Sequence, residues 1–206
     1  NMKNRFWTVD ILGLAFAEVI VWASLFYSFP ATLIEWHVHF GWSISNISIS
    51  LSIALVVSGV GGIFSGRVID LGFARSLMTI SSVIGGLLLL AIPLVTEIWQ
   101  FHLIWSLLGV AMSGCLYQPC FSFLIKKYGT DARRGIILIT LVAGLAGTFC
   151  FPASNFIINN YDWETSMYFF GLLTMLGATP LFWISVNNNR DQSQIIENVT
   201  NQSTVN

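Results

Sequence analysis

The chain has 206 residues, of which 55% are hydrophobic and only 9% are charged. Its mean hydropathy is +0.73, whereas about a quarter of the residues of a typical soluble domain are charged. This composition excludes an ordinary soluble domain and predicts a membrane domain. The net charge of -1 says nothing about nucleic acid, but the chain has no basic run longer than two residues that could bind phosphates, so no nucleic-acid partner is expected.

Apolar segments follow one another along the chain, each long enough to cross a bilayer. They cover residues 9–34, 45–69, 76–96, 101–126, 135–159 and 164–186. The first segment is too long for the core of a signal peptide, so we expect it to remain in the mature protein. Short polar connections, the first at residues 35–41, make consecutive helices antiparallel neighbours. The sequence thus predicts an all-α membrane protein with a bundle of six transmembrane helices over residues 9–186.

Charge placement predicts the orientation of these spans. Six spans place the amino-terminal segment 1–8, the second and fourth connections and the polar tail 187–206 on one side of the membrane. Every basic residue lies on that side, either in these segments or at the adjoining span ends: Lys3, Arg5, Arg67, Arg75, Lys126, Lys127, Arg133, Arg134 and Arg190. Short cytoplasmic loops are enriched in Lys and Arg, so we expect both termini to be cytoplasmic. The tail has no apolar periodicity and is expected to be disordered. Tryptophans gather near the opposite ends of the spans, as in an interfacial belt: Trp36, Trp42, Trp99, Trp105 and Trp163.

Glu18 is the only acidic residue deep inside a predicted span. An ionisable group in hydrocarbon is costly unless it faces protein or water, which favours a functional role. Gln118 lies eight residues inward from Lys126, as Glu18 does from Asp10, so both should lie about 12 Å above the same membrane edge. They could share one polar cavity. The structural alternative is a protonated Glu18 that hydrogen-bonds to a neighbouring helix.

Neighbouring residues could extend this cavity. Trp22 and Leu25, at i+4 and i+7 from Glu18, lie on its predicted helix face, and Tyr117 flanks Gln118. Asn155 in the fifth span either lines the cavity or bonds to another helix. The three cysteines have no metal-type spacing and are interpreted as packing residues. No metal or cofactor is expected.

Small residues and a proline predict how the helices pack and bend. Gly62 and Gly66 form a GxxxG pair in the second span, which predicts a close helix approach. Pro152 in the fifth span should free a backbone carbonyl and bend the helix.

The connection between spans two and three, Gly66-Arg-Val-Ile-Asp70-Leu-Gly-Phe-Ala-Arg75, resembles the signature loop of the major facilitator superfamily. Further segments resemble its monocarboxylate-transporter-like bacterial branch: Gly41-Trp-Ser, Tyr117-Gln-Pro-Cys-Phe121, Lys126-Lys-Tyr-Gly, Arg133-Arg-Gly and Phe151-Pro. The resemblance implies the first six helices of a twelve-helix carrier in a bacterial inner membrane. Its first, second, fourth and fifth helices would line a midplane site. Leu71 departs from the usual basic residue after the signature aspartate.

On this resemblance we expect half of a secondary transporter that moves a small organic solute, such as a monocarboxylate or another organic anion, by alternating access. Its partners would be the lipid bilayer, the substrate, and a carboxyl-terminal six-helix half or a second copy. Many proton-coupled members of the family carry an arginine in the fourth span, but residues 105–114 contain no basic residue. Proton coupling would therefore depend on Glu18. The alternative is a truncated protein that does not transport and acts as a partner of another membrane protein. An intramembrane enzyme is not expected, because the three histidines lie at the span ends, away from a serine nucleophile.

Overall fold

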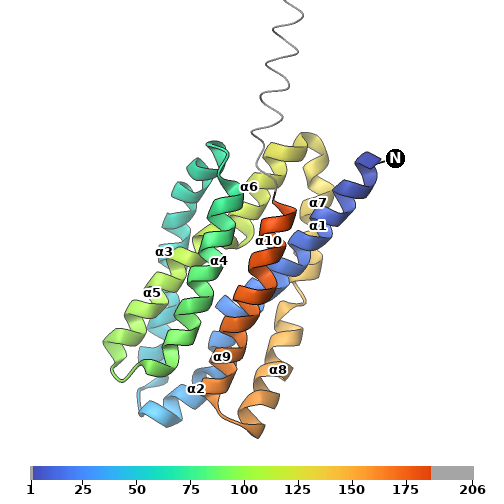
Figure 1. Ribbon diagram of the computed structural model, residues 1–206. Coiled ribbons are helices and arrows are strands. Elements are labelled where there is room, and N and C mark those ends of the chain that lie inside the picture. Colours follow the sequence, from blue (N-terminus) through green and yellow to red (C-terminus); the bar gives the residue numbers. More distant parts are fainter. Residues whose placement is uncertain (1, 187–206) are drawn as a thin grey trace, which may run out of the picture.

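The computed structural model describes residues 2–186, with side chains from Asp10 onward, and the described chain is helical without strands (Figure 1). Its elements, in order, are α1 (Met2–Val21), η1 (Trp22–Tyr27), α2 (Ser28–Phe40), α3 (Ile44–Asp70), α4 (Ala74–Ala91), η2 (Ile92–Leu94), α5 (Ile98–Cys115), α6 (Tyr117–Tyr128), η3 (Gly129–Asp131), α7 (Ala132–Ala143), α8 (Ala146–Asn160), α9 (Trp163–Leu173), η4 (Thr174–Ala178) and α10 (Thr179–Ser185). The predicted tail at 187–206 lies outside the described residues.

These elements make helical stretches that are long and apolar enough to cross a membrane. The described residues contain five such stretches: Asp10–Phe40, Ile44–Asp70, Ala74–Leu94, Ile98–Asn160 and Trp163–Ser185. The fourth reverses at the 3-10 turn Gly129–Asp131, so α5–α6 and α7–α8 run in opposite directions (Figure 1). The chain therefore passes through the bundle six times, and the predicted all-α membrane fold is confirmed.

The passes define two ends of the bundle. The amino terminus, the α3–α4 and α6–α7 connections and the end of α10 lie at one end, which we call the N-terminal end (Figure 1). The α2–α3, α4–α5 and α8–α9 connections lie at the opposite, distal end. All basic residues of α3, α4, α6 and α7 are therefore near the N-terminal end.

Local chemistry sets the helix ends at the distal end. The predicted break at 35–41 was wrong, since α2 continues to Phe40 and stops only at Gly41, which takes the left-handed conformation (φ 70°). Ser43 Oγ accepts the Asn46 amide (3.2 Å) and caps α3. Asp162 caps α9 by accepting the Thr165 amide at 2.6 Å. Hydrogen bonds from the Thr165 side chain and from this amide lower the pKa of the Asp162 carboxyl.

The two groups of three passes pack in equivalent ways. The second pass, α3, packs against the fourth, α5, as the fifth pass packs against the first through α7 on α1 and α8 on η1. The third pass, α4, also packs against α5, as the sixth packs against α1 through α10. Such a pattern is typical of two three-helix repeats within one bundle. The fourth pass is therefore the helix on which passes two and three pack, and the first pass is the helix on which passes five and six pack.

One glycine contact brings two helices close together. A Cβ on Gly109 of α5 would lie 2.9 Å from Ala54 Cα of α3, so backbone meets backbone there. Of the predicted GxxxG pair, Gly62 faces the Gln118 side chain of α6, whereas nothing lies within 4 Å of a Cβ built on Gly66. Only half of that pair contributes to close packing.

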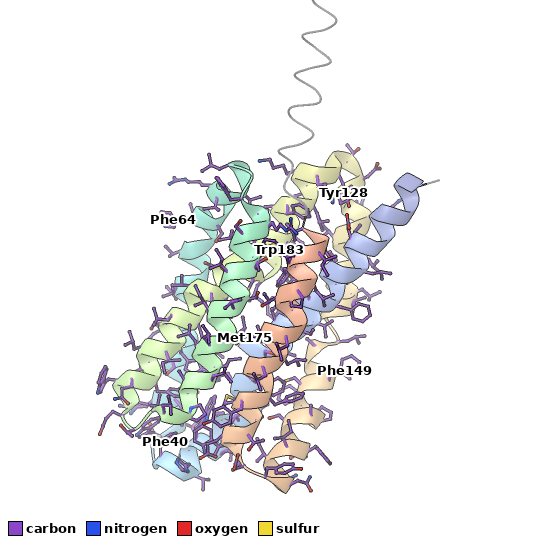
Figure 2. The ribbon with its side chains drawn as sticks, in the orientation of Figure 1. Phe40, Phe64, Tyr128, Phe149, Met175 and Trp183 are labelled. Carbon is purple, nitrogen blue, oxygen red and sulfur yellow. The ribbon has the colours of Figure 1, made fainter. Side chains whose placement is uncertain are left out.

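The distal half of the core is aromatic. The Phe29 and Trp105 ring centres are 4.6 Å apart, and those of Trp36 and Phe101 are 5.0 Å apart. Trp36 and Trp105 are fully buried, so they belong to the core and not to an interfacial belt. The outer surface is apolar as well: Phe64 and Phe149 project outward (Figure 2), as suits a surface against lipid.

Candidate functional site

A buried carboxyl group lies at the centre of the candidate site. Glu18 on α1 is completely buried, and among the described residues neither of its carboxyl oxygens has a hydrogen-bond partner. The Trp22 indole and the Cys120 thiol are its polar neighbours. No Lys or Arg of the described chain forms an ion pair with Glu18. A buried carboxyl group without a compensating cation is costly and is typical of a functional position in a membrane.

Aromatic rings from three passes form a band beside Glu18. The Trp22 and Tyr117 ring centres are 4.7 Å apart, and Tyr117 stacks on Phe121 at 5.1 Å. On the other side, Tyr27 lies 6.5 Å from Trp22 and 6.2 Å from Phe151. Each of these five rings is half-buried or exposed. This aromatic band therefore separates the Glu18 carboxyl group from the surface of the bundle.

The helices that carry the band are all interrupted near it. Pass one contains the π-helical segment η1, Trp22–Tyr27, and pass four breaks at Leu116, just before Pro119 in the first turn of α6. Pass five breaks at Gly144–Leu145. That break is not at Pro152, where we predicted the bend, since Pro152 lies inside the continuous helix α8. Interrupted membrane helices expose backbone groups and commonly surround binding sites.

We predicted Leu25 on the helix face of Glu18, and the interruption in pass one explains why it lies elsewhere. On a regular α-helix Leu25 would lie on the Glu18 face, but a π-helical segment takes more residues per turn and so rotates the later residues about the helix axis. Leu25 is instead fully buried, with its methyl groups about 3.0 Å from where a Gly85 Cβ would lie on α4. The same rotation brings Tyr27 to the band, and this residue was not predicted.

Cys120 was also missed. We interpreted it as a packing residue, yet it lies three positions after Tyr117 and thus on the same face of α6, beside Glu18. That spacing was the available signal.

The remaining predicted cavity residues, Gln118 and Asn155, are exposed and make contacts of their own. Gln118 is exposed, and its amide approaches Gly62 of α3. Asn155 on α8 is exposed and accepts a hydrogen bond from Asn159 (3.0 Å). The Cys150 thiol contacts the Ala23 carbonyl at 3.2 Å, which fixes the level of α8 against pass one. Asn155 lies five residues beyond Cys150, toward the distal end, and Glu18 lies five residues before Ala23, toward the N-terminal end. About 15 Å along the helix axes therefore separates Asn155 from Glu18.

The signature-like loop is held by a lysine and not by its aspartate. Lys126 of α6 donates to the backbone carbonyl oxygens of Ile69 (3.0 Å) and Asp70, at the carboxyl end of α3. A cation there offsets the negative end of the helix dipole. The Asp70 carboxylate itself is exposed and makes no ion pair with another described residue. Gly66 lies half-buried in the last turns of α3.

Two further contacts tie this end together. Lys127 forms a 2.8 Å ion pair with Asp10 of α1. Consecutive lysines thus fasten α6 to α3 and to α1. Arg75, at the start of α4, stacks on the Trp183 ring of α10 with 3.8 Å between the guanidinium carbon and the ring centre.

One serine–histidine contact exists that the sequence did not suggest. Ser50 Oγ lies 2.6 Å from His102 Nδ1, between α3 and α5. Ser50 is fully buried, so the pair serves as an interhelical hydrogen bond and presents no accessible nucleophile. Among the described residues, no group of three His, Cys, Asp or Glu side chains could hold a metal ion.

Comparison with known proteins agrees with this architecture. The family profile of the Major Facilitator Superfamily matches residues 12–203. No curated protein and no solved structure matches the chain. The family match extends over most of the sequence and includes the helices that carry Glu18, the aromatic band and the signature-like loop. The chain is therefore a multi-pass membrane protein that belongs to the Major Facilitator Superfamily of transporters.

Proposed function

We propose that these six helices are one half of a secondary active transporter that carries a small organic solute by alternating access. The observation that carries this proposal is the buried, unpaired Glu18 carboxyl group behind the aromatic band. Helices one, four and five, which are interrupted around it, are among those that line the midplane site in carriers of this architecture.

A second bundle is the partner that this half requires. Gln118 on α6 is exposed, and so are Asn155 and Asn159 on α8. Polar side chains are disfavoured against lipid and gain if another helical bundle covers them. The partner is a carboxyl-terminal six-helix half or a second copy of this chain.

The substrate is a small organic molecule, and a monocarboxylate or another organic anion is the class that the sequence resemblance suggests. No Lys or Arg lies on the aromatic band or beside Glu18 in the described chain. The counter-charge for an anion would therefore come from the second bundle. Glu18 would carry the proton, because it is the only carboxyl group in the centre of the described bundle.

The orientation follows from the charges. Arg67, Arg75, Lys126, Lys127 and Arg133 all belong to helix ends at the N-terminal end of the bundle. Basic residues favour the cytoplasmic side. We therefore propose that this end, with both termini, faces the cytoplasm of a bacterial inner membrane.

Uptake by proteoliposomes tests the function. The chain is reconstituted alone and together with a second six-helix bundle, and uptake of radiolabelled acetate, lactate and pyruvate is measured with and without an inward proton gradient. We expect saturable, gradient-driven uptake only with two bundles. Glu18→Gln should abolish the response to the gradient while the protein still inserts and remains helical.

Glu35→Gln is the matched control, since Glu35 lies on α2 near the distal end and the substitution makes the same chemical change. It should leave uptake unchanged. Normal gradient dependence in Glu18→Gln would reduce Glu18 to a structural residue. Uptake by this chain alone would show that two copies of it suffice for transport. No uptake with any second six-helix bundle would favour the alternative of a non-transporting partner protein.

A further inference from the structure

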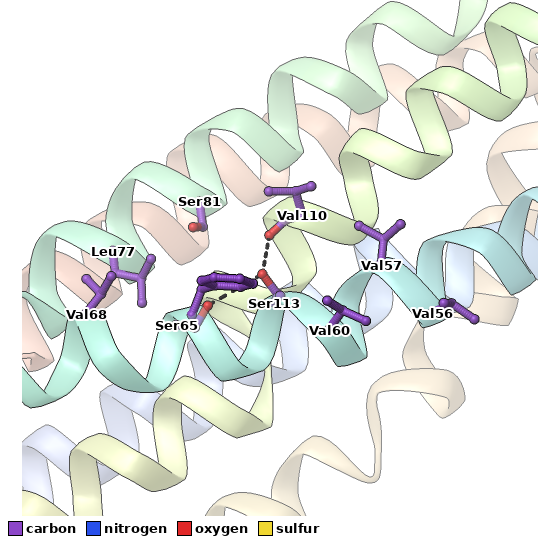
Figure 3. Close-up of a pocket in the computed structure, with 12 residues that line it drawn as sticks. Val56, Val57, Val60, Ser65, Val68, Leu77, Ser81, Val110 and Ser113 are labelled. Carbon is purple, nitrogen blue, oxygen red and sulfur yellow. Dashed lines mark hydrogen bonds between the residues drawn. The ribbon is translucent and has the colours of Figure 1, made fainter.

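A groove of about 570 Å³ lies between α3 and α4, with α5 as its floor (Figure 3). Its walls are apolar: Val56, Val57, Val60, Phe64 and Val68 of α3 and Leu77 of α4. The floor on α5 includes the small residues Ser113 and Gly114, and Gly61 widens the groove on the α3 side. Because α3 and α4 pack more on α5 than on each other, the groove stays open between them.

The groove opens away from the candidate transport site. Val60 is 57% exposed and Phe64 59% exposed, so the α3 wall reaches the outer surface of the bundle. Gly62, on the flank of α3 that faces α6, contacts Gln118 instead. The groove lies on the flank of α3 that faces α4, so the groove and the Gln118 contact lie on different sides of the same helix. In a bilayer the solvent at this surface is hydrocarbon, so an apolar chain fills such a groove.

Positive charge stands at the N-terminal end of the groove. The Arg67 guanidinium carbon lies 5.8 Å from the centre of the Phe64 ring, which lines the groove. Arg67 is exposed, and it forms no ion pair with another described residue. Opposite it begins α4, whose first turn carries the lining residue Leu77 and whose amino-terminal end is capped by no side chain of the described chain. A helix amino terminus and an arginine both favour an anionic oxygen group.

The other charges near this end do not cancel Arg67. Asp70, one turn further along α3, is exposed and repels an anion. The Lys126 ammonium group lies against the backbone carbonyl of Asp70 and offsets that charge. Arg75 is engaged by Trp183 of α10. Net positive charge therefore remains at the mouth of the groove.

We propose that this groove binds an anionic phospholipid, with one acyl chain along the valines of α3 and the headgroup phosphate at Arg67. The proposal does not depend on the transported solute. The acyl chain supplies affinity through apolar contact, and the phosphate supplies selectivity through charge-assisted hydrogen bonds from the guanidinium group.

Native mass spectrometry of the purified full chain in detergent tests this site. Dioleoylphosphatidylglycerol or dioleoylphosphatidylcholine is titrated in, and the fraction of chain that retains one lipid is measured. We expect retention of phosphatidylglycerol at about tenfold lower lipid concentration than phosphatidylcholine, and Arg67→Gln should remove that difference. Val60→Trp should fill the groove and weaken the retention of both lipids.

Two matched variants serve as controls. Arg133→Gln removes an exposed charge at the same end of the bundle, on α7, and Ile63→Trp adds the same bulk to α3 at an exposed position outside the groove. Both should bind lipid as the unmodified chain does. Equal retention of the two lipids by the unmodified chain would overturn the proposal. So would unchanged binding by Val60→Trp, or a dimer of the chain that Val60→Trp alone disrupts, since a second copy would then occupy the groove.

Discussion

The backbone contact between α3 and α5 gives the sharpest test of the packing. Replacing Gly109 by Ala puts a methyl group 2.9 Å from Ala54 Cα and 3.0 Å from its carbonyl carbon, both of them backbone atoms of another helix. Neither atom can rotate away, so the two helices have to separate. Overpacking of this kind costs about 1–3 kcal/mol. Alanine returns roughly 0.5–1 kcal/mol in a helix relative to glycine.

We therefore expect Gly109→Ala to lower the free energy of unfolding by about 1–2 kcal/mol. For a chain of this size that corresponds to a fall in melting temperature of roughly 2–8 °C. Circular dichroism of the detergent-solubilised protein during heating measures it. Gly59→Ala is the matched control, because nothing lies within 4 Å of a Cβ at Gly59. If Gly109→Ala melts at the same temperature as Gly59→Ala, the close approach of α3 and α5 is not real.

Two other predictions concern the N-terminal end. The Asp10–Lys127 ion pair is partly buried, with side chains 21% and 15% exposed. Asp10→Asn and Lys127→Gln should therefore show a coupling of about 0.5–1 kcal/mol in a double-mutant cycle of unfolding free energies. Additive effects of the two substitutions would mean that the pair contributes nothing to stability. Alkaline phosphatase fused after Val186 should be inactive in bacterial cells, whereas a fusion within the α8–α9 connection at Tyr161 should be active, and the reverse pattern would invert the proposed orientation.

The sequence predicted the overall fold because lipid imposes simple rules on it. A span must be apolar over about 20 residues, and its backbone groups must bond within the helix. Composition alone therefore located the passes to within a few residues. The first connection was an exception. Polar residues at 35–40 suggested a loop, but without a glycine before Gly41 the helix had no local reason to stop.

Parts of the candidate site were also readable from the sequence. Glu18 stood out because a carboxyl group inside a span is expensive, and Trp22 and Tyr117 followed from helical spacing. Asn155 shows the limit of this reasoning. It lies on the expected helix, but its level against pass one is set by the Cys150–Ala23 contact, and that places it about 15 Å along the axis from Glu18.

The amino-acid sequence alone specified the apolar passes and the end of the bundle at which the basic residues gather. Both features depend only on the local free energy of transferring each segment into lipid. Tertiary structure decided which faces of those helices meet. The π-helical segment in pass one turned Leu25 into the core and brought Tyr27 to the aromatic band. The close approach of α3 and α5 falls at Gly109 of α5 and not at Gly66 of α3. Both outcomes depend on helix rotation and axial register, which are set by side chains distant in the sequence packing against one another.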